Sequence, residues 1–233
     1  MPHQKDKKES VLLYAKNINK SFNYPSHFSV LKDLSLTIFR KQAIAIMGAS
    51  GEGKTTLLHI LGSLSRADSG DIFIEEKAFT SFPIHIIRQK FMGFIFQSHN
   101  LLDDFSTLEN IIMPARIARY SINKNSDIYK KAISLLDYVG LKKRMFFPAK
   151  HLSGGEKQRV AIARSLILNP KIILADEPSG NLDYKTSKTI HHLLLECVRT
   201  MGKTIIIVTH DKELASLCDK IYLLKNGKLF LQN

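Results

Sequence analysis

The segment GASGEGKTT, residues 48–56, has the residue types and the spacing of a loop that holds phosphate. It matches the pattern G-x-x-x-x-G-K-[ST] at every position, between an apolar strand-like run and a helical pattern. In such a loop successive backbone N–H groups converge on phosphate oxygens, and the following helix adds the positive end of its dipole. The loop residues that we expect to contact a nucleotide are Gly48, Ala49, Ser50, Gly51, Glu52, Gly53, Lys54, Thr55 and Thr56.

Two side chains of this loop have specific roles in phosphoryl chemistry. Lys54 would reach the β- and γ-phosphates, and the Thr55 hydroxyl would ligate Mg²⁺. Glu52 places a negative charge among these groups. Because the backbone binds the phosphates, the side chain of Glu52 can point outward. At about 8 Å across water, its repulsion with a bound Mg·ATP of net charge −2 costs only about 1 kcal/mol. We therefore expect Glu52 to leave phosphate binding intact.

A second acidic element completes a candidate phosphoryl-transfer site. The run IILADEP, residues 172–178, is an apolar strand that leads into Asp176 and Glu177. A carboxylate at the end of a strand beside the phosphate loop can bind Mg²⁺, directly or through water, which is the role we expect for Asp176. The adjacent Glu177 can orient the attacking water and act as general base.

A third motif, LSGGEKQRVAIAR at residues 152–164, opens a predicted helix. Ser153 and the N–H groups of Gly154 and Gly155 lie at the start of this helix, which makes a second anion site on the same chain. Together the three segments strongly resemble the nucleotide-binding domain of ATP-binding cassette (ABC) ATPases, in which LSGGEKQ is similar to the signature motif. The resemblance covers about residues 11–231 in the order and spacing of the family.

The resemblance implies an enzyme that binds and hydrolyses ATP with Mg²⁺. It gives roles to Gln97, which would sense Mg²⁺ and the water, to Asp183 in the D-loop SGNLD, and to His210, which would bind the γ-phosphate. Phe22 stands where the family has an aromatic ring against adenine, with Tyr24 and Phe28 as alternatives. The implied catalytic residues are Glu177, His210, Gln97 and Lys54, and the implied Mg²⁺ ligands are Thr55, Gln97 and Asp176.

In the family the signature motif faces the γ-phosphate held by a second subunit, so the resemblance implies a head-to-tail dimer of this chain with ATP between the copies. Hydrolysis removes the ligand that joins the halves, which converts chemistry into motion. The outer rim of the phosphate loop would face the other subunit. We therefore hypothesise that Glu52 tunes dimer closure rather than nucleotide binding.

The elements that must position these groups alternate between strands and helices, which predicts an α/β fold with a mainly parallel sheet. Apolar runs or alternation predict strands at 11–16, 30–38, 43–47, 71–76, 93–96, 172–175 and 204–208, and a last hairpin around Asn226-Gly227. Helical spacing predicts helices after the phosphate loop and at about 128–139, 154–168, 185–201 and 212–218.

The implied class is a P-loop NTPase (RecA-like) core with an N-terminal antiparallel β subdomain and an inserted α-helical subdomain at about 98–165. We expect a charged tail over residues 1–10 and one nucleotide-binding domain over 11–233.

Composition indicates an ordinary globular chain of 233 residues, with 44% hydrophobic and 24% charged residues. No apolar run approaches the roughly 18 residues of a membrane span, and the N-terminus has no signal-peptide core, so we expect a cytoplasmic protein. Cys197 and Cys218 show no metal-binding spacing, and Cys197 lies on an apolar helix face, which indicates a buried structural thiol. The histidines His191 and His192 are neighbours that a helix points apart, and no zinc pattern is present.

A single cassette without a membrane span implies separate membrane subunits. The segment GFIFQSHNLLDDFSTLENIIMP, residues 93–114, looks most like the ATPases of the lipoprotein-releasing (Lol) system, which act at the cytoplasmic face of the bacterial inner membrane. In the family the part after Gln97 docks the membrane partner. The apolar residues that suit an amphipathic helix, or else pack within the helical lobe, are Leu101, Leu102, Phe105 and Leu108.

Two alternatives stay open. Relatives that serve macrolide export and cell division share GFIFQ and the two leucines, but match the rest of this segment less well. The net charge of +13 is compatible with a soluble ABC ATPase that acts on ribosomes or DNA. Relatives of that kind have two cassettes in one chain or long coiled coils, and neither is present, so we expect no nucleic-acid partner. The cargo contacts would lie in the membrane subunits, so this chain does not encode them.

Overall fold

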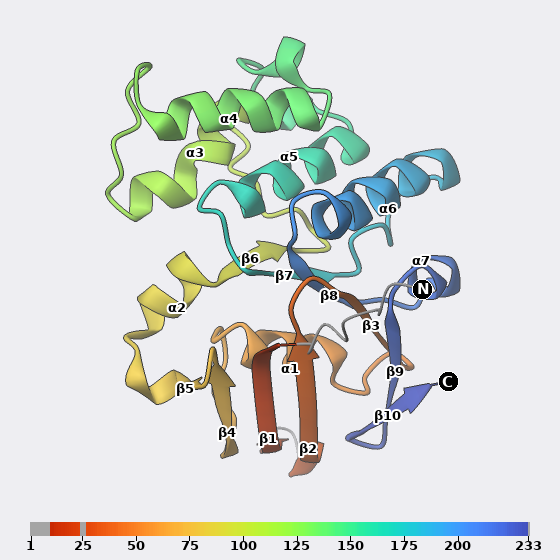
Figure 1. Ribbon diagram of the computed structural model, residues 1–233. Coiled ribbons are helices and arrows are strands. Elements are labelled where there is room, and N and C mark those ends of the chain that lie inside the picture. Colours follow the sequence, from red (N-terminus) through yellow and green to blue (C-terminus); the bar gives the residue numbers. More distant parts are fainter. Residues whose placement is uncertain (1–9, 24–26, 233) are drawn as a thin grey trace, which may run out of the picture.

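The computed structural model describes residues 10–23 and 27–232. The expected charged tail, apart from Ser10, and the alternative adenine contact Tyr24 lie outside the described residues. Figure 1 shows three layers: an antiparallel sheet, a larger sheet in the middle, and a lobe of helices above it. The fold class expected from the sequence, a P-loop NTPase core with an antiparallel β subdomain and an inserted helical subdomain, is confirmed.

The central sheet has six strands in the order β10-β9-β3-β8-β7-β6. All neighbouring pairs are parallel except the terminal hairpin β9–β10. Strands β7 and β8 are buried along their whole length, as continuous apolar runs predict for parallel strands covered on both faces. The strands are β3 (Ala43–Met47), β6 (Met92–Ile95), β7 (Ile172–Asp176), β8 (Thr204–Val208), β9 (Lys220–Lys225) and β10 (Lys228–Gln232).

The second sheet is antiparallel, in the order β2-β1-β4-β5. Its strands are β1 (Val11–Phe22), β2 (Phe28–Phe39), β4 (Ser69–Ile74) and β5 (Lys77–Ala78). β1 runs beyond the expected 11–16 because β2 pairs with it as far as Phe22. The strand expected at 71–76 ends at Ile74, since Glu75 and Glu76 both have positive φ and turn the chain into β5.

Seven α-helices are present among the described residues: α1 (Lys54–Leu61), α2 (Ile84–Lys90), α3 (Thr107–Ile117), α4 (Asp127–Tyr138), α5 (Gly154–Leu166), α6 (Tyr184–Arg199) and α7 (Lys212–Ser216). Short 3₁₀ helices lie at Phe79–Ser81, Lys142–Arg144 and Ala149–His151. In Figure 1, α3, α4 and α5 form the lobe above the central sheet. They fill the insertion expected at about 98–165.

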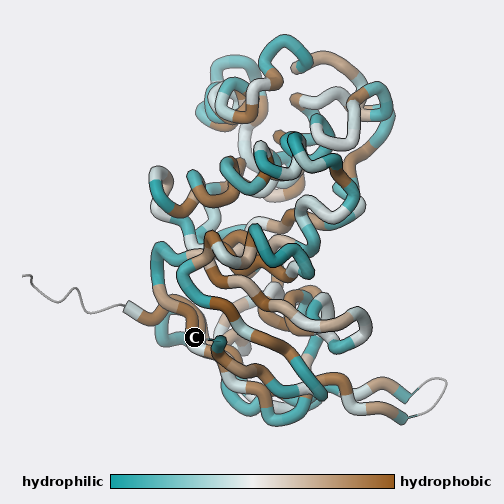
Figure 2. Tube along the Cα trace, turned by 90° about the vertical axis from the view of Figure 1, so that its right-hand side faces the viewer, coloured by the Kyte–Doolittle hydropathy of each residue, from teal (hydrophilic) through white to brown (hydrophobic). Residues whose placement is uncertain are grey.

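Two hydrophobic clusters form the core, one on each face of the central sheet. Because side chains alternate along a strand, Ile173 joins the cluster with the helical lobe and α6, while Ile172 and Leu174 join the cluster with α1 and the antiparallel sheet. Figure 2 shows apolar residues following the strands through the middle of the molecule. Cys197 is fully buried in the first cluster, which confirms that it is a buried thiol on the apolar face of its helix.

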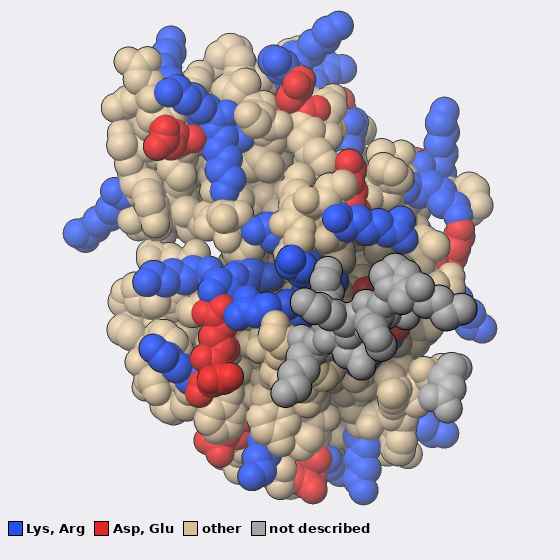
Figure 3. Space-filling model, in the orientation of Figure 1, with Lys and Arg blue, Asp and Glu red and all other residues tan. Residues whose placement is uncertain are grey.

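Two sequence expectations, about the last turn and about the two neighbouring histidines, are confirmed. Asn226 and Gly227 have φ of 54° and 79°, the positive values that a type I′ hairpin requires. His191 and His192 point apart, with side chains 3% and 79% exposed. On the face seen in Figure 3, Lys and Arg form several separate groups among acidic side chains rather than one continuous patch. No helix in the described part of the chain has the length and apolarity needed to cross a bilayer.

Candidate active site

A cavity of about 710 Å³ lies at the carboxyl ends of four neighbouring parallel strands, where ligands bind in open α/β sheets. The phosphate loop follows β3, Gln97 follows β6, Asp176 ends β7 and His210 follows β8. The cavity is lined by Phe22, Phe28, Val30, Gly48, Ser50, Gly51, Gly53, Lys54, Thr55, Thr56, Gln97, Asp176, Glu177, Val208 and His210. Most of the residues singled out by the sequence therefore meet in one place.

The phosphate loop has a backbone that only glycine permits at its tightest point. Gly53 has a φ of 94°, and a Cβ there would lie 2.3 Å from Cγ1 of Val30. Lys54 starts α1, and its ammonium group donates to the carbonyl oxygens of Gly48 and Ala49, both at 3.0 Å. The side chain thus crosses the loop and holds a cation at the cavity, where a polyphosphate would meet it.

The carboxylate of Glu52 turns away from this cavity. Its Oε2 accepts a hydrogen bond of 2.6 Å from the backbone N–H of Asn226, in the turn between β9 and β10. Neither Glu52 nor Ala49 lines the cavity. The Glu52 carboxylate is thus directed away from the position of a bound phosphate, and its hydrogen bond connects the loop to the C-terminal hairpin.

Asp176 provides an observation that bears on Mg²⁺. Its side chain is buried, and its Oδ1 has no hydrogen-bond partner among the described residues. Burial raises the pKa of this carboxyl, while the Thr55 hydroxyl acts in the opposite direction. An orphaned carboxylate oxygen beside a hydroxyl fits a hard divalent cation. No group of three or more His, Cys, Asp or Glu side chains that could hold a metal occurs among the described residues, so such a cation would also need phosphate oxygens.

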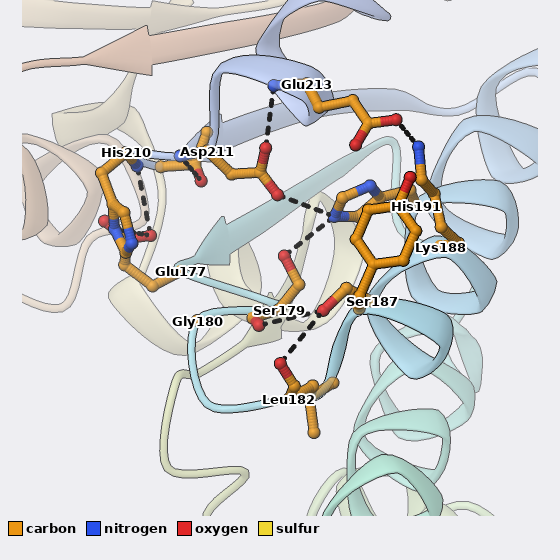
Figure 4. A pocket seen from close by; sticks show the side chains of 12 residues that line it. Glu177, Ser179, Gly180, Leu182, Ser187, Lys188, His191, His210, Asp211 and Glu213 are labelled. Carbon is orange, nitrogen blue, oxygen red and sulfur yellow. Dashed lines mark hydrogen bonds and ion pairs between the residues drawn. The ribbon is translucent and has the colours of Figure 1, made fainter.

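Glu177 and His210 form a close contact at the mouth of the cavity. His210 Nδ1 lies 2.9 Å from Glu177 Oε2, and the backbone N–H of His210 donates to the same oxygen at 3.3 Å. The Glu177 side chain is 13% exposed and that of His210 69%. The carboxylate is thus held by the histidine, which has room to move, and Figure 4 shows this contact beside a neighbouring pocket.

Phe22 and Phe28 both line the cavity. Their ring centroids are 5.8 Å apart and the ring planes differ by 32°. The ammonium of Lys20 lies 5.5 Å from the centre of the Phe22 ring. Two of the three rings that the sequence offered for adenine are thus side by side, and either can contact a base.

The signature residues lie outside this cavity. Ser153 caps α5 in a capping box with Glu156, and both Ser153 and Gly154 are exposed. Gly155 packs against α6, because a Cβ there would lie 2.3 Å from Cγ2 of Thr186. Asp183 caps α6 by accepting from the backbone N–H of Thr186 at 3.0 Å. The structure therefore does not bring Ser153, Gly154, Gly155 or Asp183 to the phosphate loop of the same chain.

One residue expected at a docking surface is internal. Leu108 is 6% exposed and belongs to the core of the helical lobe, so of its two alternatives, docking a partner helix or internal packing, the structure shows internal packing. It lies in the first turn of α3 on the face that packs inward with Ile111 and Ile112. Leu101 and Phe105 are half-buried, and Leu102 is 44% exposed.

Three features define the ATP-binding cassette class of ATPase. The phosphate loop follows β3, the acidic pair stands at the end of β7, two strands away in the sheet, and the signature helix lies in an inserted helical lobe. Comparison with known proteins agrees, since the model of the ABC transporter family matches residues 31–180. The chain belongs to this family, and it is an ATP-binding ATPase of that class.

Individual relatives cover nearly the whole chain. It is 46% identical over 221 residues to the lipoprotein-releasing system ATP-binding protein LolD of Protochlamydia amoebophila, covering 95% of this chain and 97% of the relative. The protein of the same name from Rickettsia felis is 45% identical, with 94% and 98% covered. A solved ATP-binding cassette, dimeric and bound to ADP and phosphate, superimposes with a TM-score of 0.87 at 33% identity, covering 95% and 98% of the two chains.

Proposed function

We propose that this chain is the ATP-hydrolysing subunit of a membrane complex that releases lipoproteins from the bacterial inner membrane. The observation that carries the proposal is 45–46% identity, over nearly the full length of both chains, to proteins named for lipoprotein release. The subunit would lie at the cytoplasmic face of that membrane and bind separate permease subunits.

The residues of the cavity support ATP binding and hydrolysis. The glycine-rich backbone and the start of α1 would hold the phosphates, and the Lys54 ammonium would leave the carbonyl oxygens of its own loop for phosphate oxygens. Thr55, Asp176 and Gln97 would hold Mg²⁺, which supplies charge neutralisation on the β- and γ-phosphates when bound. Phe22 and Phe28 would stack against the adenine.

The contact between Glu177 and His210 suggests how catalysis is controlled. A base must be free to accept a proton from water, and Glu177 is engaged by His210 at 2.9 Å. When the exposed His210 side chain turns to a γ-phosphate, it releases the Glu177 carboxylate. Glu177 would then orient and deprotonate the attacking water, and Gln97 would contact the same water.

The position of the signature residues supports a head-to-tail dimer. Ser153 and Gly154 are exposed, lie at a helix start, and do not line the cavity of their own chain. The N–H groups of such a helix start suit an anion held by another molecule. A second copy would therefore complete each ATP site, with Asp183 at the same junction.

A groove beside the helical lobe suits a permease. It has a volume of about 460 Å³ and is lined mainly by apolar side chains, including Phe94, Phe96 and Ile117. Arg164 lies in its wall and donates to the carbonyl oxygens of His99 and Asn100, next to Gln97. A short amphipathic helix of the permease would fit there, and its movement would reach Gln97 through the loop that contains His99 and Asn100.

The test is reconstitution with the membrane subunits that copurify with this chain from native membranes. Proteoliposomes that hold an acylated lipoprotein should release it only when ATP is added, and the control variant Glu177→Gln should bind ATP without release or turnover. Lys54→Ala should bind no ATP. Copurification with one macrolide-exporter-type or division-type subunit, and no lipoprotein release, would contradict the proposal.

A further inference from the structure

A buried polar cluster joins three elements beside the catalytic contact. His191 of α6 lies with its Nε2 2.9 Å from Oγ of Ser179 and 3.3 Å from Oδ2 of Asp211. Ser179 is in the loop after β7 and Asp211 in the loop after β8. Ser179 and His191 are 7% and 3% exposed. Figure 4 shows the imidazole reaching both partners across a pocket of about 360 Å³ whose other wall is Glu177 and His210.

The geometry of this cluster fits a structural connection between Ser179 and Asp211 through His191, and it does not fit an activated serine nucleophile. The serine hydroxyl and the carboxylate both meet Nε2, and Nδ1 is buried with no partner among the described residues. In a hydrolytic triad the two groups would meet opposite nitrogens. Because a carboxylate can only accept, the proton belongs on Nε2, where it lies between Asp211 and Ser179. Ser179 is also too buried to attack a substrate.

Packing alone does not require a histidine here. His191 shares the buried face of α6 with Ile190, Leu194 and Cys197, and an apolar side chain would fill that face without desolvating an imidazole. The histidine adds a directional connection between two loops. Asp211 is fixed for this contact, because its Oδ1 already accepts from the backbone N–H groups of Glu213 and Leu214 at the start of α7.

The two connected loops are those that carry the catalytic pair. Ser179 lies two residues after Glu177, and Asp211 follows His210 directly. At the strand ends the loops are joined where the backbone N–H of Glu177 donates to the carbonyl of Val208 at 2.9 Å. Beyond the strands, among the described residues, they are joined by the contact of Glu177 with His210 and by the contacts of His191 with Ser179 and Asp211. Lys188 and Glu213 pair at the rim of the same pocket.

We propose that His191 is a positioning residue for ATP hydrolysis, which holds the Glu177 loop and the His210 loop in register through Ser179 and Asp211. The proposal rests on the proposed ATPase function. When His210 leaves Glu177 for a phosphate, the catalytic contact no longer joins the loops, and the link through His191 persists. Glu177 then keeps its place opposite the phosphate although its former partner has moved.

The test compares two substitutions at position 191 in the full chain. His191→Met keeps the bulk and removes the donor, and it should lower kcat for ATP hydrolysis by about 10-fold, since small misplacement of catalytic groups is costly. The KM for ATP and the thermal midpoint should stay near those of the wild type. His191→Gln keeps an N–H near the Nε2 position and should recover most of kcat. His192→Met, on the exposed side of the same helix, is the matched control and should behave as wild type.

A second variant covers the case in which His191→Met does not fold. Ser179→Ala removes one hydroxyl and should also lower kcat several-fold at unchanged KM. If the foldable variants at positions 179 and 191 all turn over like the wild type, the positioning role is wrong. It is also wrong if His191→Met loses kcat and thermal stability together without rescue by His191→Gln, because that pattern marks packing. Failure of the ATPase function itself would look different: the unmodified chain would not hydrolyse ATP, or Glu177→Gln would not reduce turnover.

Discussion

Glu52 of the phosphate loop accepts a hydrogen bond of 2.6 Å from the backbone N–H of Asn226, 174 positions further along the chain. The start of the loop also contacts the strand before this turn, because a Cβ on Gly48 would lie 2.6 Å from the carbonyl oxygen of Leu224. The loop therefore rests on the C-terminal hairpin. An acid that looks unfavourable for phosphate binding in the sequence is a structural contact that points away from the phosphates.

Removal of the Glu52 carboxylate should loosen this attachment. Glu52→Ala should lower the free energy of unfolding by about 1 kcal/mol, because a charged acceptor is lost from a partly exposed hydrogen bond. Glu52→Gln keeps an acceptor oxygen and should lose less. Thermal unfolding of both variants measures this, with ATP affinity expected to stay near wild type. Equal midpoints for Ala, Gln and wild type would show that the bond to Asn226 contributes nothing. The effect of Glu52→Ser on ATP-driven dimerisation stays a separate prediction.

The signature helix and the start of α6 are too close for any side chain at position 155. Gly155→Ala would bring the new Cβ to 2.3 Å from Cγ2 of Thr186, so α5 or α6 must shift. We expect a loss of about 1–3 kcal/mol in stability, as for other overpacked sites. Thr186→Ser deletes that methyl group and keeps the hydroxyl that donates to Asp183. Gly155→Ala should therefore be rescued by Thr186→Ser.

Denaturant unfolding of the two single variants and the double variant tests this interpretation. The double variant should be more stable than Gly155→Ala alone, with a coupling free energy of about 1 kcal/mol or more. If the stability losses of the two single variants simply add in the double variant, the strain does not arise from the contact between positions 155 and 186. ATPase assays of the same variants separate packing from a role in the dimer, because restored stability without restored turnover would indicate that the Cβ also obstructs the second subunit.

The sequence predicted the motifs well because each is local. Each motif is contained in one short segment: the nine residues of the phosphate loop, the acidic pair and the capping serine of the signature. Apolar runs likewise predict the parallel strands. What it missed depends on contacts between distant segments. Leu108 has the same apolar character as the exposed Leu102, and only the packing of α3 buries it. For His191 the sequence predicts only that it points away from His192 on a helix, because its partners Ser179 and Asp211 lie on two other elements.

His191 should make stability depend on pH. Burial holds the pKa of its imidazole below the usual range, Lys188 acts in the same direction, and Asp211 opposes them. In the unfolded chain a histidine titrates near about 6.5. Below that pH the unfolded state therefore binds a proton that the folded state resists, and the free energy of unfolding falls as pH is lowered. Above that pH both states are neutral at this position and the term vanishes.

Unfolding at pH 7.5 and at pH 5.5 measures the effect. His191→Met should lose less stability than the wild type over this interval. The decrease should shrink rather than disappear, because burial also holds the pKa of His99 below its usual range. His192→Met provides the control and should keep the full decrease. Parallel pH profiles for wild type and His191→Met would show that another group is responsible.

Lys131 of α4 carries a charge that the fold does not favour. Burial lowers the pKa of its ammonium to about 8, and the positive charge of Lys203 adds to the effect. At pH 7 Lys131 is protonated in both the folded and the unfolded state, so the folded state bears the full cost of burying the ammonium. Between about pH 8 and 10.5 this cost is relieved, because the lysine loses its proton in the folded state first. Lys131→Met should therefore stabilise the protein at pH 7 by about 1 kcal/mol, a value reduced for partial solvent access.

That gain corresponds to a rise of about 2–4 °C in the thermal midpoint. The neighbouring Lys130 is exposed, so Lys130→Met should leave the midpoint nearly unchanged. The advantage of Lys131→Met over the wild type should also narrow as pH rises from 8 to 10, because the wild-type lysine then becomes neutral in the folded state. A stabilisation that persists unchanged at pH 10 would trace the gain to the added apolar surface of methionine and not to the removed charge.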